Sequence, residues 1–187
     1  ALVKQGLKDY PGAEALMLAT LEARGTDYGK DSTDYRSLLN NLGVMYGEQG
    51  DLSRQYDYLQ RSCVAEHEAS GPSHPSTLIC DHNLARALVD MKRYDDAEVL
   101  ERTTMQLALP VFGADHMFMG VTAYTHAGII GYLGRTRESE EQFADAIILL
   151  DKALGPGNER SAKAVLLRDE VRAAMKGRNV SAKPASA

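Results

Sequence analysis

Two pairs of cysteine and histidine are the residues best suited to bind a metal ion. Cys63 and His67 lie four positions apart, and Cys80 and His82 lie two positions apart. Thiolate and imidazole groups are the usual zinc ligands, but this spacing matches no zinc finger, and the two pairs fall on different predicted elements. We therefore expect buried structural cysteines, no metal site and no cofactor.

The other reactive side chains show no arrangement that is typical of catalysis. The sequence has no P-loop, no glycine-rich dinucleotide fingerprint, no Gly-x-Ser-x-Gly elbow and no His-Glu-x-x-His motif. Adjacent carboxylates such as Asp95 and Asp96 fall on a polar helix face, where solvation explains them. His74 and His116 lie 42 residues apart, so a repeat explains both. We predict that this chain alone is not an enzyme.

The composition indicates a soluble, folded protein. It has 187 residues, 44% of them hydrophobic and 25% charged, with a formal net charge of −5. No apolar run approaches the ~18 residues of a membrane span, and no basic cluster suits nucleic acid. With only two cysteines and no signal-peptide pattern over residues 1–10, we expect a reducing, cytoplasmic location. The chain does not begin with Met, so we expect a processed product or part of a longer protein.

Glycine recurs along the chain at a fixed interval. Gly29, Gly71, Gly113 and Gly155 are separated by 42 residues at every step. A period of this size predicts a repeat architecture, in which each unit buries its apolar face against the next. Apolar residues fall at helical spacing, and no alternating β-branched run is present, so each unit should be helix–turn–helix–loop.

Each predicted unit has a first helix, A, and a second helix, B. The A helices are expected at about 32–49, 75–91, 116–133 and 159–176, and the B helices at about 11–24, 53–69, 95–109 and 137–154. Ser73, Asp115 and Asn158 are candidate N-caps. Pro110 should end its helix, because the residue before a proline disfavours the α conformation.

The turn between the helices and its flanks resembles the tetratricopeptide repeat, in the 42-residue variety typical of kinesin light chain and many bacterial proteins. The matching segments are Asn40-Asn-Leu-Gly-Val-Met-Tyr-Gly-Glu-Gln-Gly-Asp51, Asn83-Leu-Ala-Arg-Ala-Leu and Arg93-Tyr-Asp-Asp-Ala-Glu98. The resemblance implies an all-α, right-handed helical-repeat solenoid of antiparallel helix pairs. It implies a partial repeat at 1–28, full repeats at 29–70, 71–112 and 113–154, and a capping helix at 155–178. The small, polar, proline-containing stretch 179–187 indicates a disordered tail.

In this family the A helices line a concave groove that holds the partner. Carried over to this chain, the groove-facing residues are Ser37, Asn40, Asn41, Val44, Glu48, Ile79, His82, Asn83, Arg86, Asp90, Val121, Tyr124, Thr125, Gly128 and Tyr132. Asn can donate to and accept from a peptide backbone, and Tyr offers flat apolar area with a polar tip. The alternative is that these are ordinary solvated side chains. Some members of the family clamp a partner's terminal carboxylate with Lys, Arg and Asn side chains of successive A helices. Here the position four residues after Asn40 is Val44, so the pattern is incomplete and a strict carboxylate clamp is not expected.

Two residues occupy positions that are usually apolar in the family, namely Asp81 and His126. A buried carboxylate without a partner is costly, so we expect Asp81 to pair with His126 or with a nearby Arg. The alternative is a rotated helix on which Asp81 faces water.

The function that the resemblance implies is a protein-interaction scaffold. Its peptide-binding groove would hold an extended peptide or a helix, with no nucleic acid or membrane as partner. Two alternatives stay open at this point. One is a sensory domain that controls an attached effector domain, which a neighbouring effector in the full-length chain would favour. The other is self-association into a homo-oligomer through the terminal repeats, which a concentration-dependent mass would favour.

Overall fold

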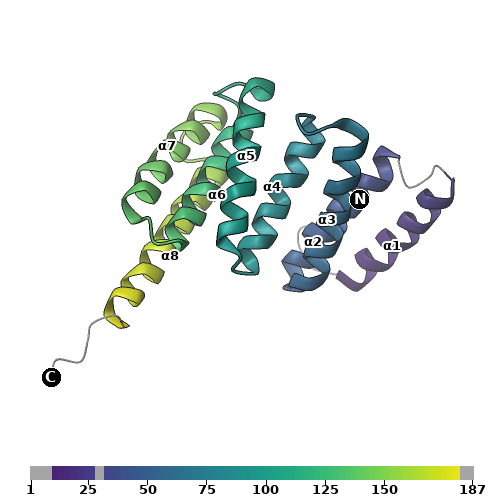
Figure 1. Ribbon diagram of the computed structural model, residues 1–187, viewed down its shortest axis with the longest axis horizontal. Helices are drawn as coiled ribbons and strands as arrows, with labels where there is room; N and C mark the ends of the chain where they lie inside the picture. The colour runs from purple at the N-terminus through teal and green to yellow at the C-terminus, as the bar shows by residue number, and fades with distance from the viewer. Residues whose placement is uncertain (1–9, 28–31, 182–187) are drawn as a thin grey trace. The chain divides into compact units, whose positions relative to one another are not determined.

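The structure is a computed structural model that describes residues 10–27 and 32–181. Over these residues it is built of helices and contains no strand, so the predicted all-α fold class is confirmed. The chain divides into two compact units, Ala1–Met91 and Lys92–Ala187. Figure 1 labels the helices of both units. Unit 1 contains α1 (Tyr10–Asp27), α2 (Thr33–Gln49), α3 (Leu52–Ser70) and α4 (Pro75–Asp90); unit 2 contains α5 (Tyr94–Phe112), α6 (Met117–Tyr132), α7 (Thr136–Leu154) and α8 (Glu159–Ser181).

In unit 1, α2 is the central helix and packs against α1, α3 and α4. Its residues Leu39, Leu42, Met45 and Tyr46 are buried and form a core cluster with Leu21 of α1. These positions recur at steps of three or four, which places them on one face of the helix. The helical spacing seen in the sequence therefore identifies the face of α2 that is turned to the core.

A polar contact fixes α1 onto α2 and α3. The Tyr46 hydroxyl donates to Glu14 Oε1 at 2.9 Å, and Arg54 Nη1 lies 2.8 Å from the same oxygen. The Arg54 guanidinium also lies 4.2 Å from the centre of the Tyr46 ring, a cation–π contact. Burial of Tyr46 and the neighbouring Glu14 carboxylate raise the pKa of Tyr46 to about 12, so the phenol stays a donor at neutral pH.

In unit 2, α6 packs against α5, α7 and α8. Phe143 and Leu150 of α7 are fully buried at 0% exposure. Val171 of α8 joins Phe143 in one core cluster, and Ala164 of α8 joins Leu150 in another. Because both clusters also include residues of α6, α8 covers apolar surface of α6 and α7 together.

The 42-residue glycine period marks helix ends. Gly71, Gly113 and Gly155 follow α3, α5 and α7 with φ of 79°, 81° and 92°. Side chains with a Cβ rarely adopt this conformation, so glycine is required at each position. Gly29, the first member of the series, lies outside the described residues.

A second repeating position follows the A-type helices α2, α4 and α6. Gly50 and Gly134 have φ of 78° and 90°, and Lys92 occupies the corresponding position with φ of 60°. A left-handed residue here lets the chain leave the helix while its amide satisfies a free carbonyl. Lys92 is the one non-glycine residue with positive φ in the described part of the chain.

We expect Lys92→Gly to stabilise the protein. Glycine would remove the strain of the left-handed conformation, which costs roughly 1–2 kcal/mol in the folded state. It would also cost roughly 0.5–1 kcal/mol, because glycine gives the unfolded chain more conformational entropy. The free energy of unfolding should therefore rise by about 0.5–1 kcal/mol. Urea unfolding followed by circular dichroism measures this. The reverse change, Gly134→Lys, serves as the control and should destabilise. A loss of stability in Lys92→Gly would contradict the interpretation.

Two of the three predicted N-caps are wrong. His74 and His116, rather than Ser73 and Asp115, cap α4 and α6, and each Nδ1 accepts from the backbone N–H two residues later, at 3.3 and 3.1 Å. An imidazole nitrogen with a lone pair can replace the usual oxygen acceptor. The third cap is confirmed, since Asn158 Oδ1 accepts two backbone N–H bonds at the start of α8, at 2.9 and 3.0 Å.

Two predicted helix ends are also wrong. Pro110 lies inside α5, which continues to Phe112. The hydrogen bond that proline cannot make would end on the carbonyl of Gln106, an exposed residue of the last turns, where water can replace the lost donor. At the C-terminus α8 continues to Ser181, so residues 179–181 of the predicted tail are helical. Residues 182–187 and the predicted helix end at 1–9 lie outside the described residues.

The two cysteines, expected as buried structural residues, are buried and are also joined by a disulfide that the sequence did not predict. Cys63 of α3 and Cys80 of α4 form a disulfide with a Cα–Cα distance of 5.4 Å. Both residues are buried, with exposed fractions of 3% and 2%. Disulfides are typical of oxidising environments, so this bond weighs against the reducing location expected from the cysteine count.

Candidate functional site

Three adjoining pockets surround the exposed face of α2. The sequence-predicted residues on this helix, Ser37, Asn40, Asn41, Val44 and Glu48, each line at least one of them. Steps of three and four residues place these side chains on one helix face, roughly opposite the core residues of α2. The helix therefore presents a mainly polar strip with a hollow on either side.

The groove between α2 and α4 is divided by a pair of amide side chains. Asn83 Nδ2 donates to Asn40 Oδ1 at 2.9 Å. Asn40 lines a pocket of about 190 Å³, here called the amide pocket, and Asn83 lines one of about 280 Å³, here called the charged pocket. Within the described residues neither amide bonds elsewhere, so Asn40 keeps its two N–H donors and Asn83 keeps its carbonyl acceptor.

The pockets differ in chemistry. The charged pocket is lined by Val44, Glu48, Gln55, Asn83, Arg86 and Asp90. A third pocket of about 320 Å³, here called the apolar pocket, lies between α1 and α2 and is lined by Tyr10, Ala13, Met17, Leu38, Val44 and Met45. Asn41 and Glu48 also line the apolar pocket. Val44 and Glu48 are thus shared by the apolar and charged pockets.

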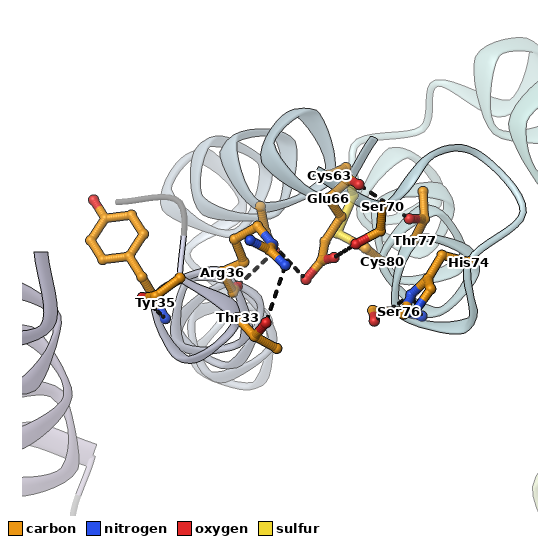
Figure 2. A network of polar contacts seen from close by, with 12 residues as sticks. Thr33, Tyr35, Arg36, Cys63, Glu66, Ser70, His74, Ser76, Thr77 and Cys80 are labelled. Carbon is orange, nitrogen blue, oxygen red and sulfur yellow. Dashed lines mark hydrogen bonds and ion pairs between the residues drawn. A yellow bond between two sulfur atoms is a disulfide. The ribbon is translucent and has the colours of Figure 1, made fainter. Parts of the chain in front are cut away.

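A buried ion pair supports the amide pocket. Arg36 Nε of α2 lies 3.2 Å from Glu66 Oε1 of α3, with side-chain exposures of 6% and 4% (Figure 2). Ser62 Oγ donates to the Arg36 carbonyl at 2.9 Å, and Thr77 Oγ1 of α4 donates to the Glu66 carbonyl at 3.4 Å. Because Ser62 and Glu66 also line the amide pocket, the network that joins the three helices fixes part of its wall.

The expected pairing of Asp81 with His126 is wrong. His67 Nε2 lies 3.0 Å from both carboxylate oxygens of Asp81. His126 instead has Nδ1 2.7 Å from Gln142 Oε1 and Nε2 3.7 Å from Glu98 Oε1. Burial raises the pKa of the Asp81 carboxyl above its usual range, and His67 opposes this shift. His67 lies on α3, a B-type helix, whereas the partners expected from the sequence were His126 or an Arg on neighbouring A helices.

We expect Asp81→Asn to be more stable than the parent at pH 7, with a gap that narrows as the pH falls toward ~4. A carboxyl whose pKa is raised on folding contributes stability below its unfolded pKa, and this contribution is lost as the pH rises through the folded pKa. Denaturant midpoints at several pH values measure the gap. The control His67→Gln removes the imidazole that contacts Asp81 and shows how much of the effect depends on this partner. A variant less stable than the parent at pH 7 would show that the pair is net favourable.

The predicted residues on α4 divide into two groups. Asn83, Arg86 and Asp90 line the charged pocket, where Asp90 Oδ2 accepts from Gln55 Nε2 at 2.9 Å. Among the described residues Arg86 makes no hydrogen bond or ion pair. His82 is only 5% exposed and lines none of the three pockets. Ile79, the fifth predicted residue of this helix, lines the amide pocket, so four of the five predicted side chains line a pocket.

The predicted residues on α6 lie within the packing of unit 2. Tyr124 packs against two core clusters, and Thr125 is 7% exposed. Tyr132 stacks on Tyr94 of α5 with ring centres 5.0 Å apart. None of the three lines a pocket described above. The candidate site is accordingly the α2 face of unit 1.

Sequence reasoning missed the α1 side of this site. Tyr10, Ala13 and Met17 line the apolar pocket, with Leu38 facing them from α2. Their spacing of three and four residues marks one face of a helix, so periodicity could have found them. Gln55, which was not among the predicted site residues, also lines the charged pocket and donates to Asp90 there.

Metal-binding clusters and membrane-spanning helices were both looked for among the described residues. No group of three or more His, Cys, Asp or Glu side chains gathers there in a way that could hold a metal ion. Over the same residues no helix combines the length and apolar character needed to cross a membrane.

Comparisons with known proteins define the class. Residues 77–116 match the family model described as tetratricopeptide repeat. With the all-α helical architecture, this match shows a helical-repeat protein that carries a tetratricopeptide repeat, as the sequence predicted. No curated protein matches the sequence significantly.

The particular likeness is to kinesin-light-chain-like repeats. Two crystal structures of nearly identical TPR-like repeats from a kinesin-light-chain-like protein of Podosopora anserina, one of them the Q17M variant, share the fold. Their TM-scores are 0.72 for the variant and 0.70 for the other, each at 15% identity, covering 90% of this chain and 80% of theirs. At this identity the likeness extends to the fold alone, and a fold by itself does not determine function.

Proposed function

We propose that the protein binds an extended peptide segment of a protein partner along the α2 face of unit 1. The observation that carries this proposal is the Asn40–Asn83 pair, which bridges α2 and α4 with pockets on both sides. A peptide backbone alternates N–H donors and C=O acceptors, and the free groups of the two amides supply the complementary pattern. Asn41, exposed and without a hydrogen bond to any described residue, adds a third amide to the strip.

The proposed mechanism is recognition by a preformed surface. The Arg36–Glu66 ion pair and the Cys63–Cys80 bridge join the helices that carry the pocket walls, so little ordering of the protein accompanies binding. Ordering of mobile side chains and loops is one of the main costs of association, and a fixed surface avoids it. Amide contacts would hold the peptide main chain, and the pockets would select side chains.

A pull-down from the source lysate tests this function. The bait is the protein, compared with a groove variant that carries Asn40→Ala, Asn41→Ala and Asn83→Ala, three amides of the α2 face. The matched control carries Gln60→Ala, Arg61→Ala and Glu68→Ala, three exposed positions on α3 outside the pockets. We expect a partner that binds the parent and the control and is lost by a folded groove variant. A partner retained by all three, or self-association without a partner, would contradict the proposal.

Two observations point to different cellular locations. The sequence favours the cytoplasm, whereas the Cys63–Cys80 disulfide would be maintained in an oxidising compartment. Alkylation of the protein as isolated from its source, followed by mass measurement, decides between the two. Two labelled thiols would support the cytoplasm, and no labelled thiol would support an oxidising environment.

A further inference from the structure

The two pockets that share Val44 and Glu48 call for different side chains of a ligand. The apolar pocket is walled by Ala13 and Met17 of α1 and by Leu38 of α2. Its volume of about 320 Å³ suits a large apolar side chain. Removal of apolar surface from water favours association, so this pocket can supply the main apolar anchor.

The charged pocket carries more negative than positive charge. Glu48 and Asp90 contribute two carboxylates, and Arg86 contributes one guanidinium. Glu48 is exposed and has no hydrogen-bond or ion-pair partner among the described residues. Asp90 is held by Gln55, whose amide donates to it at 2.9 Å. Arg86 lies one helical turn from Asp90 but forms no ion pair with it, so both charges stay available to a ligand.

We propose that the partner segment carries a large apolar side chain for the apolar pocket and, close to it, a lysine or arginine for the charged pocket. This inference rests on the proposed peptide-binding function. In an extended segment, side chains two residues apart point to the same side and lie about 6.6 Å from each other. The two pockets share the Val44 and Glu48 walls, so neighbouring side chains of one segment can enter both.

The charges give each residue a distinct role. Glu48 stands between the pockets and meets the cationic group of the ligand, and Asp90 meets it from the α4 side. Arg86 repels that group but can donate to main-chain carbonyl oxygens of the segment. Removing the charge of Glu48 should therefore weaken binding of a basic segment, whereas removing the charge of Arg86 should strengthen it or leave it unchanged.

A displayed library of random nine-residue peptides, selected on the protein, tests the inference. We expect the enriched peptides to contain an apolar residue followed or preceded within three positions by Lys or Arg. Enrichment with acidic residues, or with no charge preference, would overturn the inference and leave the proposed function intact. Failure to enrich any peptide would overturn both.

The affinity of one enriched peptide for variants of the protein then tests the roles of Glu48 and Arg86. By fluorescence anisotropy at low salt we expect Glu48→Gln to weaken binding about two- to fivefold, the range of partly exposed ion pairs. Higher salt should reduce the difference. The matched control Glu68→Gln removes an exposed carboxylate of α3 that lines none of the pockets and should not change the affinity. Equal loss in both variants, or weaker binding of the basic peptide by Arg86→Gln, would contradict the assigned roles.

Discussion

Glu66→Met is expected to lower the free energy of unfolding by about 3–5 kcal/mol, the largest effect that we predict for a single substitution. Methionine keeps the volume of the side chain but removes the carboxylate that lies 3.2 Å from Arg36 Nε. The guanidinium, whose side chain is 6% exposed, would then stay buried while losing the Glu66 carboxylate. Urea unfolding followed by helical circular dichroism measures the loss.

A double variant separates charge from packing. Arg36→Met with Glu66→Met removes both charges, so stability should recover most of the loss seen in Glu66→Met alone. Glu68→Met is the matched control, because Glu68 lies on the same helix and is exposed. If Glu66→Met behaved like Glu68→Met, the ion pair would not contribute to the stability of unit 1.

Gly43→Val is expected to destabilise the protein by about 3 kcal/mol, the upper part of the range for overpacking. A Cβ at Gly43 would lie 2.5 Å from Leu59 Cγ and 3.1 Å from the Leu59 backbone nitrogen. Leu59 is 1% exposed, so its side chain has little room to move. The helices α2 and α3 would have to separate, which would also disturb the charged pocket that Leu59 lines.

A graded series tests the close approach of the two helices. Gly43→Ala should cost less than Gly43→Val, because it adds only the Cβ. Asn41→Val on the exposed face of the same helix controls for the lower helix propensity of a β-branched residue. Unfolding midpoints for Gly43→Val and Asn41→Val that agree would show that α2 and α3 are not in tight contact there.

The repeat period made much of the helical architecture predictable. Gly71, Gly113 and Gly155 adopt a conformation that other residues avoid, so their recurrence located the loops that follow α3, α5 and α7 without knowledge of the packing. The apolar spacing around Leu39 and Leu42 similarly identified the buried face of α2. Local rules of this kind depend on one residue and its neighbours in sequence.

Features that depend on tertiary environment were not predictable in the same way. The length of α5 beyond Pro110 depends on solvation of its last turn. The Cys63–Cys80 bond and the His67–Asp81 contact join side chains that only the packing of α3 on α4 brings together. A propensity or a spacing within one helix carries no information on such pairs.

The candidate site was predictable in unit 1 and much less so in unit 2. On α2, the family-implied groove residues from Asn40 to Glu48 line pockets, because the opposite face of the helix is buried in a core. On α6 the same positions, including Tyr124 and Thr125, lie in the packing of the unit. This helix is apolar on most of its circumference, so repeat position alone does not identify an exposed face.

Site-specific photo-crosslinking tests the central claim, that a peptide segment is bound along the α2 face, most directly. A benzophenone amino acid would replace Asn41, which lines the apolar and amide pockets, or Val64, which is 52% exposed on α3 and lines none of the three pockets. The probe is an enriched library peptide or the partner captured by pull-down. We predict a crosslink from position 41 and none from position 64. Crosslinking from position 64 alone would contradict the account and place the interaction on another surface.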